Sequence, residues 1–207
     1  MSEALLQVED LRVAFAAGGR EIRAVDGVSY QVEAGRTLAI IGESGSGKTV
    51  GCRAIMGLLP AGAAISGSAR LRGTEMIGLS DAQLRKHRGS SMAMVFQDPA
   101  RSLNPTMRVG SQITEAIRTH RAVSKSEAHA QAVELLRLVR IPAADRRFDE
   151  YPHQLSGGMR QRVMIAIALA CRPKLLIADE ATTALDVTTQ AQIMELLLEL
   201  QDRKSVV

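Results

Sequence analysis

The segment that most constrains the fold is a glycine-rich loop, Gly42-Glu43-Ser44-Gly45-Ser46-Gly47-Lys48-Thr49, which satisfies the pattern G-x-x-x-x-G-K-[ST]. It follows a short apolar run, 37–41, and precedes a helix predicted over 48–59, which Pro60 should end. Glycines let the backbone curl so that successive N–H groups point inward, and the helix adds the positive end of its dipole. A plain Gly-Ser turn is the alternative, but the complete pattern in this context favours a loop that holds a polyphosphate.

Two side chains of the loop carry chemistry. Lys48 is expected to reach the β and γ phosphates of a bound nucleotide, and the Thr49 hydroxyl is expected to ligate Mg²⁺. The run before the loop, 37–41, is apolar on both faces, so it predicts a buried central strand. The nucleotide-binding residues predicted here are Gly42, Glu43, Ser44, Gly45, Ser46, Gly47, Lys48 and Thr49.

A second apolar strand, 175–178, delivers two acids together, Asp179 and Glu180. In open α/β sheets ligands bind at the carboxyl ends of the strands, so both acids are expected at that edge. Asp179 suits an indirect contact to Mg²⁺, through water or through another ligand of the ion, and Glu180 suits a base that polarises water for attack on the γ phosphate. An acid pair capping the next helix is the alternative. The phosphate loop in the same chain favours catalysis.

The chain divides into three stretches of one α/β domain. In residues 1–80, alternating strands at 6–13 and 25–32, joined by Gly18-Gly19, predict an antiparallel β-subdomain beside the phosphate-loop core. Residues 81–158 read as an inserted α-helical subdomain, with a capping box at Ser124 and Glu127. Residues 159–207 return to the core, with helices predicted at 159–170 and 188–203. The helix after Ser124 should bury Ala128, Ala132, Val133, Leu136 and Val139.

Composition restricts the partners. The longest uninterrupted apolar stretch, 163–171, is about half of the roughly 18 residues needed for a membrane span, and the N-terminus lacks a signal-peptide pattern. We therefore expect a cytosolic chain. The net charge is +4, but the basic groups at 85–88 and 160–162 are small and aromatic residues are few, so we expect solvated surface and no nucleic-acid partner. Cys52 and Cys171 are expected to be buried, reduced thiols.

A third motif, Leu155-Ser156-Gly157-Gly158-Met159-Arg160-Gln161, resembles the signature of the ATP-binding cassette (ABC) family. Ser156, Gly157 and Gly158 open a predicted helix, so their N–H groups form a second anion site. Taken alone, Ser-Gly-Gly before a helix is more often mere capping. The resemblance implies a head-to-tail dimer, in which the signature of one subunit covers the nucleotide on the phosphate loop of a second ABC ATPase subunit, whether identical or different.

The resemblance narrows to the ATPase subunits of dipeptide, oligopeptide, glutathione and nickel importers, because 95–99 followed by 102–105 is similar to their Q-loop region. It implies that Gln97 contacts Mg²⁺ and the attacking water. It also implies that Ala184-Leu185-Asp186 is the D-loop, which crosses to the partner subunit. Phe15 is the candidate for stacking on adenine, with Tyr30 a strand residue instead; Phe15 could equally belong to the core.

Three departures from the family pattern stand out. Ala181 occupies the position after Glu180 where the family usually has proline, which removes a restraint on φ. All four histidines precede Asp179, so none corresponds to the family's switch histidine. The C-terminal extension of the peptide-importer branch is also missing. We therefore expect a C-terminally truncated chain whose ATP hydrolysis is impaired.

The function that the resemblance implies is the ATP-binding and ATP-hydrolysing subunit of an importer, with ATP and Mg²⁺ as cofactors. It would lie on the cytoplasmic face of the cell membrane, drive permease subunits, and indirectly serve a solute-binding protein. The helical stretch near Gln97, with Leu103 and Met107, is expected to dock on the permease. A soluble ABC ATPase of DNA repair or translation, and a non-catalytic binding module, are the alternatives.

Overall fold

The computed structural model describes residues 4–180 and 187–202. The chain forms two compact units, Met1–Arg88 and Gly89–Val206. Each unit has a hydrophobic cluster built from its own residues: one centres on Val13, Val25 and Ala54, and the other draws on helices and strands between Ala93 and Leu200. The units are described one at a time.

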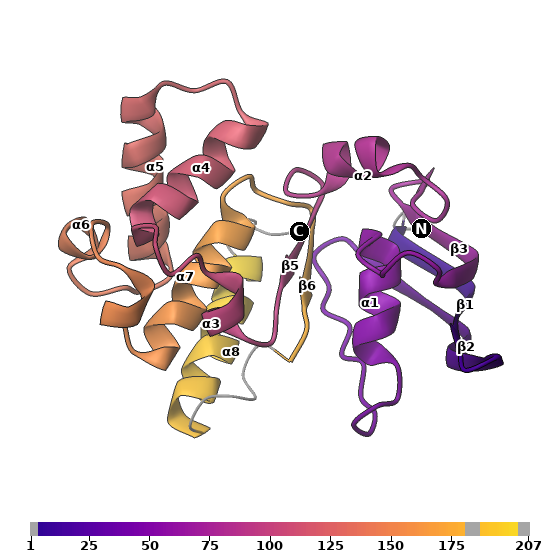
Figure 1. Cartoon of the computed structure of the whole chain (residues 1–207). Coiled ribbons are helices and arrows are strands. Elements are labelled where there is room, and N and C mark those ends of the chain that lie inside the picture. Colours follow the sequence, from indigo (N-terminus) through magenta and orange to yellow (C-terminus); the bar gives the residue numbers. More distant parts are fainter. Residues whose placement is uncertain (1–3, 181–186, 203–207) are drawn as a thin grey trace. The chain divides into compact units, whose positions relative to one another are not determined.

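A long antiparallel hairpin dominates the first unit (Figure 1). β1 (Ala4–Ala17) and β2 (Arg20–Glu33) are longer than the predicted strands, and Gly18-Gly19 joins them as predicted. Both glycines have positive φ, +58° and +76°, which suits a turn that follows the twist of the strands. β3 (Ala64–Leu71) pairs with the other side of β1, and β4 (Thr74–Glu75) with β3, giving the order β2-β1-β3-β4.

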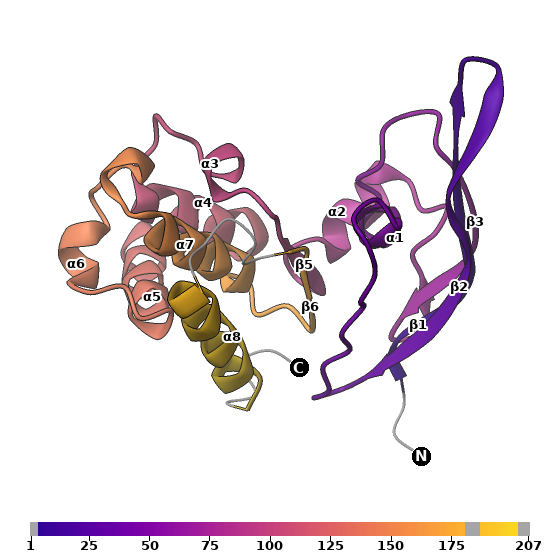
Figure 2. The same cartoon turned by 90° about the horizontal axis from the view of Figure 1, so that it is seen from below.

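The helix after the phosphate loop, α1 (Lys48–Met56), packs against β1 and β2 (Figure 2). It ends before the predicted Pro60, because Gly57 adopts a left-handed conformation and Leu58 N–H donates to the Arg53 carbonyl. A side chain at Gly57 would meet Leu84 Cδ1 at 2.3 Å, so close packing of α2 (Asp81–His87) also requires glycine there.

The predicted buried strand at 37–41 is wrong. The described backbone from residue 36 to 43 is irregular, neither described sheet includes it, and Ile41 is 94% exposed. A strand apolar on both faces is stable only with a hydrogen-bonded neighbour on each side. In the described sheets these residues have no such ladder, so their apolar pattern alone does not make them a strand.

The second unit combines a two-stranded parallel sheet with helices. β5 (Met92–Val95) and β6 (Leu175–Ala178) pair in register, and the β6 strand agrees with its prediction. Both views place the helices of this unit to one side of the strands (Figures 1 and 2). The helices are α3 (Pro99–Ser102), α4 (Val109–His120), α5 (Lys125–Leu138), α6 (Ala144–Arg147), the 3₁₀ turn η1 (Pro152–Gln154), α7 (Gly157–Leu169) and α8 (Val187–Asp202).

Helix α5 confirms the local signals of the sequence. Ser124 Oγ accepts from Glu127 N–H, and Glu127 Oε2 accepts from Ser124 N–H, which completes the predicted capping box. The five apolar residues predicted for its inner face are all buried. Helix α7 is buried on nearly every side, which makes it the central helix of this unit. Among the described helices, none combines the length and apolar character needed to cross a membrane.

Candidate functional site

The phosphate loop in the first unit is shaped by glycines. Gly45 and Gly47 have φ of +81° and +88°, and Ser46 N–H donates to the Glu43 carbonyl at 3.2 Å. A Cβ on Gly47 would lie 2.1 Å from the backbone oxygen of Ala24, which cannot move aside without disturbing β2. Gly47 therefore satisfies two demands at once, a left-handed conformation and a close approach to a strand.

Lys48 turns its side chain back over this loop. Its Nζ donates to the backbone oxygens of Gly42 at 2.7 Å and Glu43 at 2.8 Å, and lies 3.4 Å from Ser46 Oγ. The ammonium charge is thus held by the curl of the loop itself. The Lys48 ammonium therefore lies beside the loop whose backbone N–H groups are the proposed phosphate donors, and its contact with phosphate stays a prediction.

The start of α1 suits an anion for two further reasons. Its N-cap residue is Gly47, which makes no side-chain capping bond, and its first turn contains no acidic residue. The first N–H groups of a helix have no partner within the helix, and the helix dipole is positive there. Glu43 and Ser44 are exposed on the loop. The backbone conformation, the lysine and the helix start together fit the phosphates of a nucleotide.

The acidic end of β6 lies in the second unit. β5 and β6 run parallel with Val95 opposite Ala178, and the ladder continues one step further because Asp179 N–H donates to the Val95 carbonyl at 3.0 Å. Asp179 is only 6% exposed. This register sets Gln97 and Glu180 level with each other, since each follows its opposed strand residue by two positions.

Gln97 and Glu180 meet as this register requires. Gln97 Nε2 donates to Glu180 Oε2 at 2.7 Å, across 83 positions of sequence. Glu180 has a φ of +47°, a left-handed conformation that is uncommon for a residue with a side chain. Strain of this kind costs about 1–3 kcal/mol and is concentrated at functional sites. The structure therefore brings together two of the residues that the sequence assigned to catalysis.

The signature motif opens α7. Ser156 is the N-cap, and its Oγ accepts from Met159 N–H at 3.3 Å; Gly157 and Gly158 are the first helical residues. The first turn of this helix also lacks acidic residues. Ser156 therefore does cap the helix, which was the alternative explanation of the Ser-Gly-Gly sequence. It occupies the Met159 N–H, whereas the N–H groups of Gly157 and Gly158 belong to the start of the helix, where N–H groups of this kind bind anions.

The residues predicted to bind Mg²⁺ offer three kinds of oxygen: the Thr49 hydroxyl, the Gln97 amide and the Asp179 carboxylate. Mg²⁺ prefers such hard oxygen donors and usually keeps several waters, so few protein ligands suffice. Gln97 donates to Glu180 through Nε2, so its amide oxygen, Oε1, is the atom that a Mg²⁺ contact would use. Thr49 belongs to the first unit and the other two residues to the second.

Phe15 is half-buried on β1 and packs against the cluster of Val13, Val25 and Ala54. Its role on adenine stays a prediction. The predicted D-loop, Ala184 to Asp186, and Ala181 lie outside the described residues. Leu103 is wrong as a docking contact, because it is 3% exposed and belongs to the core of the second unit.

Neither cysteine forms a disulfide in the part of the chain that the structure describes, and both are half-buried instead of buried as expected. The Cys171 thiol donates to the Ala116 carbonyl at 3.4 Å, and burial raises the pKa of Cys171. Cys52 lies on α1 and Cys171 lies just after α7, and an arginine follows each of them in the sequence. A sequence pattern does not distinguish such a half-buried position from the interior.

Two arginines that the sequence assigned to solvated surface point inward. Arg88 donates to the carbonyls of Met56 and Gly57 at the end of α1 and pairs with Asp81. Arg162, on α7, is 8% exposed and donates to the Val139 carbonyl at 2.9 Å. No residue pattern marked Arg162 as buried: a buried guanidinium needs acceptors, and the Val139 carbonyl that it uses is a backbone atom 23 positions away.

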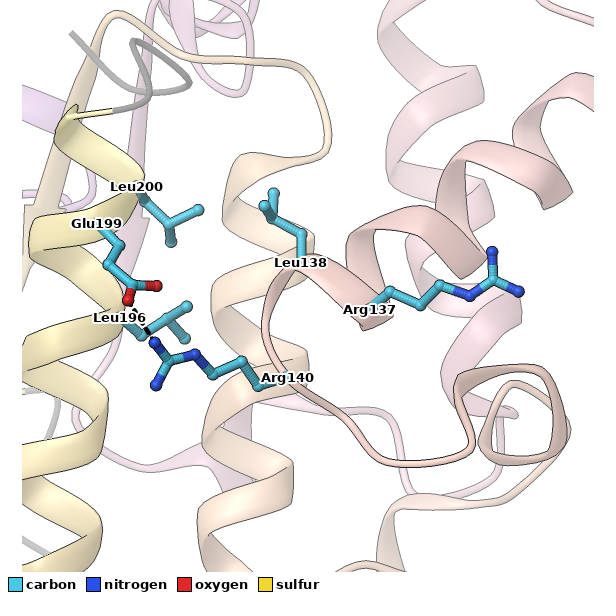
Figure 3. Close-up of a pocket in the computed structure, with 6 residues that line it drawn as sticks. All are labelled: Arg137, Leu138, Arg140, Leu196, Glu199 and Leu200. Atoms are coloured by element: carbon cyan, nitrogen blue, oxygen red, sulfur yellow. Dashed lines mark hydrogen bonds and ion pairs between the residues drawn. The ribbon is translucent and has the colours of Figure 1, made fainter.

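Figure 3 shows a surface pocket between the end of α5 and α8, lined by Arg137, Leu138, Arg140, Leu196, Glu199 and Leu200. Both arginines have carboxylate partners: Arg137 pairs with Glu134 and Asp145, and Arg140 pairs with Glu195 and Glu199. Their charges are therefore compensated within the chain. The pocket carries no excess positive charge for a phosphate, unlike the loop before α1.

Comparison with known proteins places the chain in a family. The family model described as ABC transporter matches residues 25–183. The oligopeptide transport ATP-binding protein OppD of Escherichia coli (strain K12) is 54% identical over 200 residues, which are 97% of this chain and 59% of that protein. The dipeptide transport ATP-binding protein DppD of Haemophilus influenzae (strain ATCC 51907 / DSM 11121 / KW20 / Rd) is 54% identical over 202 residues, 97% of this chain and 61% of that protein. This chain therefore spans about three fifths of the length of these relatives.

Solved structures of ATP-binding cassette proteins are also similar to this chain. One described as a dimeric post-hydrolysis state of the ATP-binding cassette MJ0796 bound to ADP and Pi has a TM-score of 0.85 and 30% identity, covering 98% of this chain and 85% of its own. Another, cbiO1 from Clostridium perfringens, described as part of the ABC transporter complex cbiONQ, has a TM-score of 0.79 and 27% identity, covering 99% and 77%. With the phosphate loop, the acidic strand end and the signature all present, and with the family model matching most of its length, the chain belongs to the ABC transporter family.

Proposed function

We propose that the chain is the ATP-binding and ATP-hydrolysing part of an importer that takes up short peptides or a related solute, such as nickel or glutathione. The observation that carries the proposal is the set of three motifs in one chain, each with the local geometry its chemistry needs. The names of the relatives, which are oligopeptide and dipeptide transport ATP-binding proteins, support the peptide class.

In this proposal the phosphate loop holds ATP. The loop N–H groups and Lys48 Nζ bind the β and γ phosphates, which exchanges the bonds of Lys48 to Gly42 and Glu43 for bonds to a more strongly charged acceptor. Phe15 stacks on adenine. Ser156, Gly157 and Gly158 present their N–H groups to the nucleotide of a second ATPase subunit, in a head-to-tail dimer. A related cassette structure is described as dimeric, which supports that assembly.

Glu180 accepts the proton of the water that attacks the γ phosphate, so that the water becomes a better nucleophile as the bond forms. Gln97 orients this carboxylate through the 2.7 Å bond to Oε2. Thr49, Gln97 and Asp179 would hold Mg²⁺, and the bound ion supplies charge neutralisation on the phosphate oxygens. In this proposal Gln97 would contact both the base and the metal ion.

The permease contact would involve the exposed loop at 104–106. Gln112, buried on α4, clamps this loop: its Oε1 accepts from Asn104 N–H at 3.0 Å, and its Nε2 donates to the carbonyls of Asn104 and Met107. The loop is thus exposed and yet fixed in shape, which suits docking on a permease. With such a permease contact the chain would work at the cytoplasmic face of the cell membrane, and a solute-binding protein would act on the other side.

The decisive experiment is nucleotide binding by Lys48→Ala. Loss of hydrogen bonds to a charged phosphate should weaken binding of a fluorescent ATP analogue with Mg²⁺ about ten- to hundredfold. Lys174→Ala, which removes an exposed lysine elsewhere, is the control and should bind as the parent does. Equal affinity of the Lys48→Ala variant and the parent would contradict the assignment of the phosphate loop.

A further inference from the structure

The signature helix makes a close contact with α8 at Gly158. A Cβ at Gly158 would lie 2.7 Å from Thr189 Cγ2, whereas Thr189 Oγ1 and Cβ would be 3.8 and 3.9 Å away. A carbon pair at 2.7 Å is well inside van der Waals contact, so either the Thr189 side chain or the helix that carries it must shift to admit a side chain at 158. The methyl group of Thr189 alone occupies the space that glycine leaves.

One turn further along, the same two helices are joined by a hydrogen bond. Arg162 Nη2 donates to Gln192 Oε1 at 3.1 Å, and its Nη1 donates to the Val139 carbonyl at the end of α5. Gly158 and Arg162 are four positions apart on α7, and Thr189 and Gln192 are three apart on α8. Residues at these spacings share one face of a helix. The two contacts therefore belong to one interface between α7 and α8.

The surroundings make this interface rigid. Ile193 and Leu196 on α8 are fully buried in the core that α7 also forms. On its outer side, α8 is held by Arg140, which pairs with Glu195 at 3.0 Å and with Glu199 (Figure 3). Burial lowers the pKa of Arg162, as does the neighbouring charge of Arg140. Figures 1 and 2 both show α8 lying beside α7.

We propose that Thr189 is a positioning residue for the signature: its methyl group against Gly158, together with the Arg162–Gln192 bond, fixes the first turn of α7 relative to α8. The proposal rests on the proposed function, in which that turn presents N–H groups to a nucleotide. It assigns Gly158 a second reason to be glycine, packing, besides the approach of its N–H to phosphate.

A double-variant cycle separates the two reasons for glycine at 158, which are packing against Thr189 and the approach of its N–H group to phosphate. Gly158→Ala should force α7 and α8 apart, lowering the temperature of unfolding by about 2–10 °C and slowing phosphate release about tenfold or more. Thr189→Ser removes only the methyl group, which leaves the nearest atoms of residue 189 at ordinary contact distance. The double variant, Gly158→Ala with Thr189→Ser, should therefore recover most of both losses. Thr188→Ser, at the adjacent exposed threonine, is the matched control and should rescue neither.

The readouts also separate this proposal from the proposed function. The Kd of the monomeric chain for ATP should stay near that of the parent in all variants, because the phosphate loop alone holds the nucleotide there, and the change should appear in kcat of the dimer. A double variant no more stable and no faster than Gly158→Ala would overturn the proposal. Recovery of stability without recovery of phosphate release would overturn the positioning role. A parent chain that binds no ATP would instead contradict the proposed function, while the unfolding temperatures would still test the packing.

Discussion

At the scale of single residues, the phosphate loop shows how two glycines of one motif can be required for different reasons. Gly45 and Gly47 both have positive φ. A Cβ at Gly45 would meet no atom within 4 Å, whereas at Gly47 it would collide with the backbone of β2. The pattern G-x-x-x-x-G-K-T includes Gly47 as a fixed position and leaves Gly45 variable, in agreement with this difference.

Alanine substitutions should reveal that difference as stability. Gly45→Ala should cost about 1–2 kcal/mol, the price of a left-handed conformation with a side chain. Gly47→Ala adds a clash with the Ala24 carbonyl at 2.1 Å and should cost about 2–5 kcal/mol. Urea unfolding of both variants beside the parent measures the two values. Equal losses would show that the Ala24 contact does not restrict residue 47.

Motif residues could be proposed from the sequence more readily than supporting ones. Lys48 and Glu180 could be proposed as catalytic from residue type and spacing within a motif, and Gln97 from the family resemblance. Arg88 and Arg162 could not, since their acceptors, such as the Met56 and Val139 carbonyls, are backbone atoms distant in sequence. Backbone oxygens are available at every residue, so no residue pattern marks them as partners.

At the scale of elements, the edge of the first sheet depends on one carboxylate. Glu75 accepts from Ala69 N–H at 2.9 Å, from Ile77 N–H at 3.0 Å, and from the Ser68 hydroxyl. Burial raises the pKa of Glu75, but these hydrogen bonds and the charge of Arg70 outweigh it, so the pKa lies below its ordinary value. The charged carboxylate therefore joins β3, β4 and the residues that follow.

This gives a pH-dependent prediction for Glu75→Gln. A carboxylate with a lowered pKa stabilises the fold above the unfolded-state pKa, and this stabilisation is lost as the pH falls through the folded-state value. At neutral pH the variant should unfold about 2–5 °C below the parent, and the difference should narrow below about pH 4.5. Thermal unfolding across this range is the measurement.

The matched control is Glu21→Gln, which removes a carboxylate that pairs with Arg23 on the exposed surface of β2. An exposed pair contributes little, so this variant should follow the parent at every pH. If the difference between Glu75→Gln and the parent stayed constant down to acidic pH, the carboxylate bonds would not be the source of its stabilisation.

Elements defined by local signals were predictable, and those defined by distant partners were not. The Gly18-Gly19 hairpin and the Ser124 capping box form between residues close in sequence, so their patterns were sufficient. The expected strand at 37–41 depended on neighbours from elsewhere in the chain, and apolar character does not supply them. Helix α1 ended early because Gly57 offered a local stop before Pro60 did.

At the scale of the whole molecule, the proposed function requires more than one chain. The signature binds no nucleotide of its own chain in this proposal, so a single copy holds two half-sites. Glu180→Gln offers a test, because the amide keeps an oxygen to accept from Gln97 but is too weak a base to accept a proton from water. Removal of a general base typically slows a reaction about 10²- to 10⁴-fold.

We therefore predict that Glu180→Gln binds ATP as tightly as the parent, releases phosphate far more slowly, and accumulates as a dimer. Size-exclusion chromatography with ATP and Mg²⁺ should show the dimer for this variant and mainly monomer for the parent. Glu134→Gln, on the exposed side of α5, is the control and should behave as the parent does. A Glu180→Gln chain that stays monomeric with ATP bound would count against the head-to-tail dimer.

The pairing of β5 with β6 also predicts how this sequence can diverge. Gln97 and Glu180 are level only because Val95 lies opposite Ala178. A single inserted or deleted residue between 92 and 97 would turn the side chains that follow to the opposite face and separate the pair. Descendants of this gene should therefore keep the length of these two strands unchanged, or change both together. At Gly18-Gly19, where a side chain would meet no atom within 4 Å, insertions should accumulate freely.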